Sequence, residues 1–156
     1  MSTLALRQPD TPHPNPSPEG EGLKFTGYAA LFDVRDRGGD VVRRGAFAGA
    51  GAPVPLLWQH DPARRIGTVR AVAEDARGLR VEAVVDGDGA VAREAAVLLG
   101  EGAVSGLSFG YRVRSARRGV AGAGGRATRE LTALELVEVS LVASPMQPGA
   151  RVDDIY

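Results

Sequence analysis

The chain has 156 residues and a mass of 16.3 kDa, which is enough for one domain with a single modest core. Nineteen basic residues balance nineteen acidic residues, so the zero net charge argues against a protein that binds nucleic acid through bulk electrostatics. Cysteine is absent from the sequence, which excludes disulfide scaffolds, thiolate zinc sites and cysteine nucleophiles.

The first 22 residues are predicted to form a disordered, proline-rich tail, and residues 23–156 are predicted to form one ordered domain. Five of the ten prolines fall between residues 8 and 22, where they fix φ and remove backbone donors, so that neither helix nor sheet can form. No apolar run approaches the ~20 residues of a membrane-spanning helix. The N-terminus also lacks the apolar stretch of a secretory signal.

The segments after this tail are predicted to be mostly strands joined by turns. Alternating apolar residues indicate strands at 23–32, 54–60, 66–73 and 78–85, with turns at 36–40 and 74–77. A short helix is predicted at residues 44–48. A longer helix is predicted at residues 90–99, which Asp88 would cap and Gly100 would end.

The C-terminal half contains two longer strand patterns. Residues 105–114 alternate strictly between an apolar face and a small polar face, the first made of Leu107, Phe109, Tyr111 and Val113, the second of Gly106, Ser108, Gly110 and Arg112. Residues 115–126 favour a flexible loop, and residues 128–143 predict a strand that residues 144–149 stop. The whole pattern predicts a mainly β fold (α+β), a single mostly antiparallel β-barrel of about six strands with flanking helices.

Ser108 stands out as a candidate nucleophile within Gly106-Leu-Ser-Phe-Gly110. The segment matches the Gly-x-Ser-x-Gly motif of α/β-hydrolases, but that motif needs a helix after the serine, whereas a strand pattern follows here. The flanking glycines would leave room beside the hydroxyl for a substrate backbone. The alternative is a strand packed closely against another element, in which Ser108 is merely small.

His60 is the candidate general base that such a serine would need. Histidine occurs only at positions 13 and 60, and His13 lies in the proline-rich tail. His60 follows a predicted strand and precedes Asp61-Pro62, which indicates the rim of a sheet, where active sites often lie. The alternative is a structural histidine without a catalytic role. Because two histidines cannot form a histidine-rich metal site, we expect no metal and no cofactor.

Glu138 is the candidate third member of the site. It lies in the almost wholly apolar segment 136–142, where a carboxylate must find a partner because burying it alone is very costly. That partner is either His60, whose imidazolium the carboxylate would orient and stabilise, or one of the many arginines. Glu135 is the competing carboxylate, but strict alternation places it on the opposite face of the strand.

Four segments occur in an order and spacing that together are specific enough to indicate a protein family. They are Gly27-Tyr-Ala-Ala-Leu-Phe-Asp33 with 39–47, Leu56-Leu-Trp-Gln-His-Asp-Pro62 with 66–67, Ser105-Gly-Leu-Ser-Phe-Gly-Tyr111, and Leu136-Val-Glu-Val-Ser-Leu-Val142 with Ser144-Pro145. From about residue 23 to 151, the chain resembles the HK97-type phage prohead (capsid maturation) proteases, a serine protease family distantly related to the herpesvirus assemblins.

The resemblance implies an assemblin-like fold for a prohead protease domain at residues 23–156, with catalytic roles for three residues. It implies a catalytic serine at Ser108 and a catalytic histidine at His60. Glu138 falls where assemblins carry a second histidine. Assemblins also use an arginine-bearing loop after that strand for the oxyanion, but residues 144–148 contain no arginine. The resemblance therefore assigns no oxyanion donor to this chain.

The implied function is a serine endopeptidase that cleaves scaffold or major capsid protein during procapsid maturation. It would act inside the immature capsid in the host cytoplasm, for a phage, a prophage or a gene transfer agent. The expected partners are the capsid protein, the scaffold and further copies of the chain, without nucleic acid or membrane. Because the chain ends at Tyr156, scaffold sequence is expected on a separate protein or within the capsid protein. Two alternatives stay open: a non-catalytic capsid-assembly or scaffolding protein with the protease fold, and an unrelated β-barrel binding module.

Overall fold

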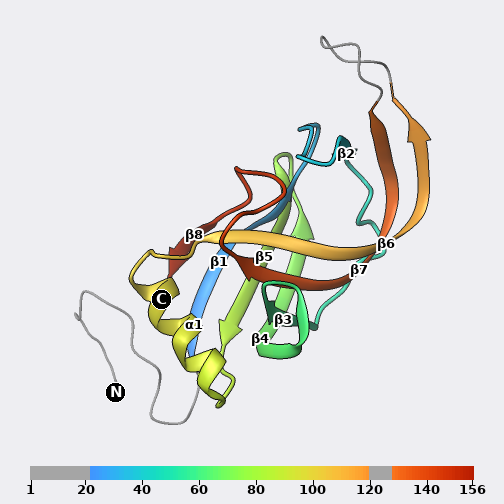
Figure 1. Cartoon of the computed structure of the whole chain (residues 1–156). Helices are drawn as coiled ribbons and strands as arrows, with labels where there is room; N and C mark the ends of the chain where they lie inside the picture. The colour runs from blue at the N-terminus through green and yellow to red at the C-terminus, as the bar shows by residue number, and fades with distance from the viewer. Residues whose placement is uncertain (1–21, 120–127) are drawn as a thin grey trace.

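The computed structural model describes residues 22–119 and 128–156, which form eight strands and one helix (Figure 1). The elements in chain order are β1 (Leu23–Leu31), β2 (Asp40–Val42), β3 (Val54–Trp58), β4 (Asp61–Glu74), β5 (Gly78–Val85), α1 (Ala90–Gly100), β6 (Gly106–Arg118), β7 (Arg129–Val142) and β8 (Val152–Ile155). The predicted mainly β fold class is confirmed. No helix among these residues is both long and apolar enough to cross a membrane.

All eight strands belong to one curled sheet in the order β2-β7-β3-β4-β5-β1-β8, with β6 paired to β7. β2 and β3 pair in parallel with opposite ends of β7, whereas the other neighbouring strands pair antiparallel. Residues of β7 that pair with β2 or β3 also pair with β6, so β6 occupies the other edge of β7. The sheet curls far enough for Gly106 on β6 to bridge Arg151 beside β8, which joins the two ends of a half-barrel (Figure 1).

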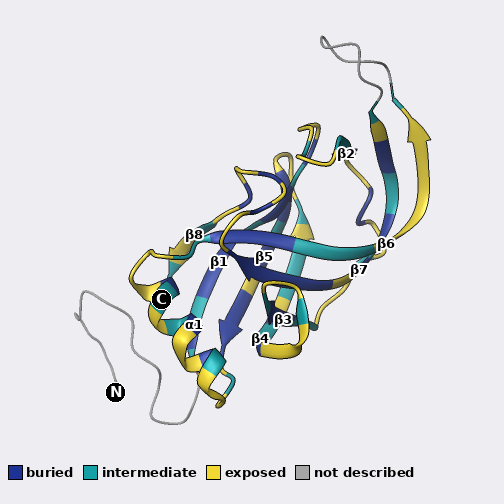
Figure 2. Ribbon diagram, in the orientation of Figure 1, coloured by how far each residue is buried: buried dark blue, intermediate teal, exposed yellow. Residues whose placement is uncertain are grey.

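The core lies inside the curl of this sheet. Its largest fully buried side chains include Phe25, Leu56, Ile66, Leu107 and Leu141, one from each of five strands. The helix α1 buries Ala92, Ala95 and Leu99 and contacts β4 and β5. Figure 2 shows this buried interior and, in contrast, the exposed far half of β6. The start of β6, which carries Ser108, therefore belongs to the core of the domain.

The sheet has eight strands rather than about six because β2 and β8 were not predicted. These strands have three and four residues, too few to show a period of two in the sequence. The short helix predicted at residues 44–48 is wrong, since this segment forms successive turns. Gly45 adopts a φ of 88°, in the left-handed region, which interrupts a right-handed helix.

Several predicted boundaries also differ from the structure. β4 begins at Asp61, five residues before the predicted start, and β6 continues through residues 115–118 of the predicted loop. The helix α1 has Gly89 as its N-cap, without a side-chain cap from Asp88. Residues 120–126 of the predicted loop lie outside the described residues, as does the predicted tail except for Gly22.

Candidate active site

The pairing of β6 with β7 places Ser108 and Glu138 on the same side of the sheet. Ser108 lies opposite Ser140, and Gly110 lies opposite Glu138. Side chains directly opposite each other on antiparallel strands project to the same side, with Cβ atoms about 4.5–5.5 Å apart. The Ser108 side chain therefore starts beside that of Ser140, two residues from Glu138.

His60 reaches the same place from the other edge of β7. Strand β3 runs parallel to β7 with Trp58 opposite Leu141, and the next backbone N–H, of Gln59, donates to the Leu141 carbonyl at 3.0 Å. The backbone N–H of His60 then donates to Ser140 Oγ at 3.1 Å. Residues 80 positions apart in sequence are thus joined at one point of the sheet, with Ser140 between Ser108 and His60.

The imidazole of His60 contacts the carboxylate of Glu138. His60 Nδ1 lies 2.6 Å from Glu138 Oε2, and the side chains are 41% and 10% exposed. Because an ionised carboxylate only accepts, Nδ1 carries the proton, and Nε2 of the neutral ring is left as the proton acceptor. The hydrogen bond that His60 donates to Glu138 raises the pKa of His60 above its usual value. The negative charge of Glu138 raises this pKa further, and desolvation of the ring lowers it.

The structure distinguishes between the two partners considered for Glu138. Among the described residues, its carboxylate contacts His60 and Ser140 and forms no ion pair with an arginine. Ser140 Oγ donates to Glu138 Oε1 at 2.7 Å. Both carboxylate oxygens therefore have a donor, which compensates for the burial of the charge.

The turn that carries His60 has an unusual backbone. Trp58 pairs with Asp61 across two intervening residues, Gln59 and His60, whose φ values are 53° and 62°. Positive φ at both central residues is the pattern of a type I′ hairpin turn, which normally contains glycine or asparagine. Strained residues of this kind persist only when their surroundings hold them, and they gather at functional sites.

A β-bulge on β7 next to Glu138 overturns the expected position of Glu135. Gly110 pairs with Glu138 while Tyr111 pairs with Leu136, so Val137 has no partner on β6. The extra residue reverses the alternation, and Glu135 therefore lies opposite Arg112, on the same side as Glu138. Glu135 forms ion pairs with Arg112 at 3.5 Å and Arg114 at 3.0 Å, whereas the carboxylate that contacts His60 is that of Glu138.

The glycines beside Ser108 have a different role from the one expected. A β-carbon on Gly110 would lie 2.5 Å from Glu138 Oε2, and one on Gly106 would lie 2.6 Å from the backbone oxygen of Val142 and 2.8 Å from Cδ of Pro145. The space beside these glycines is therefore filled by other atoms of the protein itself. The expectation that it admits a substrate backbone is wrong for these two positions.

Ser108 itself is 6% exposed, and its hydroxyl forms no hydrogen bond to the other described residues. In enzymes without substrate, catalytic hydrogen bonds are often long or poorly aligned and tighten when substrate binds. Ser105, the neighbouring serine, accepts a hydrogen bond from Arg151 at 2.9 Å instead. Ser108 is therefore the serine with an uncommitted hydroxyl close to the His60–Glu138 pair.

Ser140 and Gly110 are the members of this site that the sequence analysis missed. Ser140 lies in the apolar segment 136–142, but its spacing of two from Glu138 places both on one face of a strand. The alternation of residues 105–114 marks Gly110 only as a small residue. For both, a prediction would have required the register of β6 on β7.

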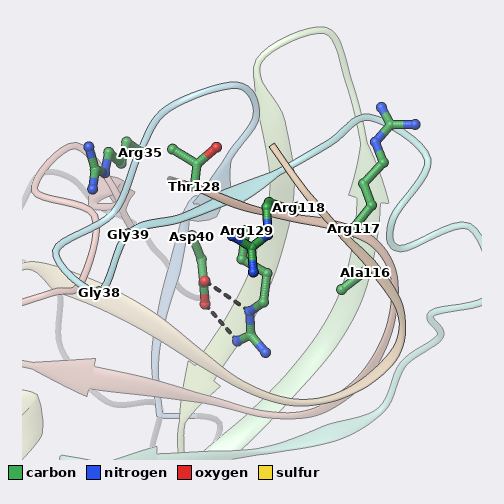
Figure 3. Close-up of a pocket in the computed structure, with 9 residues that line it drawn as sticks. All are labelled: Arg35, Gly38, Gly39, Asp40, Ala116, Arg117, Arg118, Thr128 and Arg129. Atoms are coloured by element: carbon green, nitrogen blue, oxygen red, sulfur yellow. Dashed lines mark hydrogen bonds and ion pairs between the residues drawn. The ribbon is translucent and has the colours of Figure 1, made fainter. Parts of the chain in front are cut away.

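A separate pocket of about 520 Å³ lies near the far end of the β6–β7 ribbon (Figure 3). It is lined by Arg35, Gly38, Gly39, Asp40, Ala116, Arg117, Arg118, Thr128 and Arg129. Asp40 accepts two hydrogen bonds from Arg129, at 3.0 and 2.9 Å, which Figure 3 marks with dashed lines. None of Ser108, His60 and Glu138 lines this pocket, so it is not part of the candidate site.

Comparison with known proteins gives a family and a fold. Residues 12–155 match a family described as caudovirus prohead serine protease. The structure is similar to that of Kaposi's sarcoma herpesvirus protease bound to a hexapeptide phosphonate inhibitor, with a TM-score of 0.59 and 14% identity over 86% of this chain and 65% of that chain. It is also similar to varicella-zoster virus protease, with a TM-score of 0.54 and 18% identity over 84% and 63%.

The similarity to these solved proteases shows a shared fold and nothing finer, because the sequence identities are only 14% and 18%. The chain spans less than two thirds of the length of either protein. A comparison with curated protein sequences finds no match.

Proposed function

Because the chain belongs to the caudovirus prohead serine protease family, we propose that it is a serine endopeptidase in which Ser108, His60 and Glu138 form the catalytic site. The observation that carries this proposal is the 2.6 Å contact between His60 Nδ1 and Glu138 Oε2 beside the strand that holds Ser108. This membership also argues against an unrelated binding module.

Each residue has a defined role in the proposed reaction. His60 Nε2 takes the proton of Ser108 Oγ as the oxygen attacks the substrate carbonyl carbon, and Glu138 stabilises the imidazolium that forms. His60 then gives the proton to the leaving amine as the peptide C–N bond breaks, which leaves an acyl ester on Ser108. His60 then takes a proton from a water molecule as its oxygen attacks the ester, and gives this proton to Ser108 Oγ as the ester C–O bond breaks, which releases the acid product and regenerates the serine.

The proposed substrate is the major capsid protein, a scaffold protein, or both, cleaved inside an immature capsid in the host cytoplasm. The family name supports this class of substrate because it associates these proteases with the prohead. Further copies of the chain are proposed as additional partners within the particle. No role for nucleic acid or membrane is proposed.

Co-expression of the chain with the major capsid protein of the same particle tests the proposed function. Intact mass of the capsid protein should show a defined truncation with the wild-type chain and the full-length mass with Ser108→Ala. Ser105→Ala is the matched control, because it removes a hydroxyl from the same segment, and it should leave processing intact. A capsid protein that assembles with the chain but keeps its full mass would instead indicate a non-catalytic assembly protein.

A further inference from the structure

Ser140 lies between the backbone that carries His60 and the carboxylate that contacts its ring. The residue is 0% exposed. Its Oγ donates to Glu138 Oε1 at 2.7 Å and accepts from the backbone N–H of His60 at 3.1 Å. A hydroxyl has one proton and two acceptor positions, so one group makes both hydrogen bonds at the same time.

These contacts form a closed ring of hydrogen bonds with the His60–Glu138 pair. A backbone N–H can only donate, so Ser140 Oγ accepts from His60 and its single proton goes to Glu138. The carboxylate then has one donor at each oxygen, Ser140 at Oε1 and His60 Nδ1 at Oε2. It cannot rotate without breaking one of these bonds, which determines both its orientation and the proton on Nδ1.

The backbone bond to Ser140 also acts on a strained turn. Gln59 and His60 both adopt a left-handed backbone conformation, which is uncommon for residues other than glycine. Two bonds to β7 secure this turn, from Gln59 N–H to the Leu141 carbonyl and from His60 N–H to Ser140 Oγ. Loss of the second would free the residue that carries the imidazole.

We propose that Ser140 is a positioning residue, which holds the His60 ring and the Glu138 carboxylate in the geometry that proton transfer requires. Its catalytic consequence depends on the proposed function, whereas its effect on His60 can be observed without any activity. Ser140 acts through His60 and Glu138 and does not itself contact the reacting atoms.

Two variants remove the hydroxyl in different ways. Ser140→Ala deletes it, and Ser140→Cys replaces the oxygen with a slightly larger sulfur that is only a weak donor and acceptor. The matched control is Thr26→Val, because Thr26 is 9% exposed and donates from Oγ1 to Asp153 Oδ1 at 2.9 Å, on the β1–β8 side of the sheet. This control also removes a strand hydroxyl bonded to a carboxylate, but leaves the candidate site unchanged.

Proton NMR and kinetics together test the proposal. The wild-type chain should show a low-field resonance for the Nδ1 proton of His60, assigned in a His13→Ala background that removes the other imidazole. Both Ser140 variants should broaden or lose this resonance. They should also lower kcat for capsid-protein cleavage by about 10- to 100-fold with little change in KM, because a displacement of ~1 Å has an effect of this size. Thr26→Val should change neither measurement.

A Ser140 variant that folds and keeps either the wild-type resonance or the wild-type kcat overturns the proposal. The same loss in Thr26→Val overturns it as well, since the effect would then be one of general stability. If the wild-type chain itself cleaves nothing, the proposed function fails, while the His60 resonance still decides the role of Ser140.

Discussion

The carboxylate of Glu138 lies against the α-carbon of Gly110 on the neighbouring strand, where a β-carbon would come within 2.5 Å of Oε2 and 2.9 Å of Cγ and Cδ. Glu138 can lie over this position of β6 because residue 110 has no side chain. A side chain can usually move away from an added methyl group, but this carboxylate is held at both oxygens. The geometry of the candidate site thus depends on a glycine that carries no chemistry.

Gly110→Ala should reduce cleavage by about 100-fold while the protein remains folded, because the displaced carboxylate loses its alignment with His60. The rate of capsid-protein cleavage and the melting temperature, measured on one sample, separate the two effects. Gly51→Ala is the control, since a β-carbon at Gly51 would meet nothing within 4 Å. Wild-type activity in Gly110→Ala would show that the position of the carboxylate is unimportant.

Ser108→Ala should abolish cleavage and leave the melting temperature nearly unchanged. The variant loses one hydroxyl that makes no hydrogen bond to the described residues, so little folding energy is lost with it. Ser105→Ala should retain activity, since its hydroxyl contacts Arg151 rather than the site. Normal processing by Ser108→Ala would assign the nucleophile to another residue.

The pH dependence of kcat/KM should report His60 as the base. Activity should rise with pH through a single pKa above the ordinary imidazole value of about 6.5, because Glu138 raises the pKa of His60 and only the neutral ring accepts a proton. In Glu138→Gln, any residual activity should titrate at lower pH. His13→Ala should leave the profile unchanged, whereas a flat profile between pH 5 and 8 would count against a histidine base if chemistry limits the rate.

Glu138→Gln should lower the cleavage rate by about 10⁴-fold, the scale of the corresponding carboxylate-to-amide change in trypsin-type proteases. It should also destabilise the fold by about 1–3 kcal/mol, because Ser140 and His60 both donate to this side chain and an amide can accept at one end only. Rate and urea unfolding should be measured on the same sample. A destabilised variant with full activity per folded molecule would leave a Ser108–His60 dyad.

The His60–Glu138 pair should also make stability depend on pH in a defined direction. The pKa of His60 is raised in the folded state, so protonation favours folding. The stabilisation is complete below the unfolded pKa of about 6.5 and is lost as pH rises through the folded value. The difference in melting temperature between wild type and Glu138→Gln should therefore be larger at pH 6 than at pH 8. A larger difference at pH 8 would contradict the expected direction of this pH dependence.

Local pattern was enough to predict the β class, the long helix and the three candidate residues. The alternation in residues 105–114 places Ser108 and Gly110 on one face of β6, and their pairing with Ser140 and Glu138 agrees with this, since a period of two depends only on neighbouring residues. Burial along β6 does not alternate, and Val113 of the predicted apolar face is exposed. The isolation of Glu138 in an apolar strand likewise predicts that it has a partner. His60 followed from composition, as the other histidine lies in the proline-rich segment.

The tertiary structure alone decided which partners these residues have. The bulge at Val137 moved Glu135 to the side of Glu138, and the register of β6 on β7 placed Gly110 beneath the carboxylate. Ser140 meets His60 across 80 residues of sequence. Pairing between distant strands is set by how their side chains pack in the whole sheet, and one inserted residue reverses every face beyond it. A sequence pattern that is local by nature cannot contain that information.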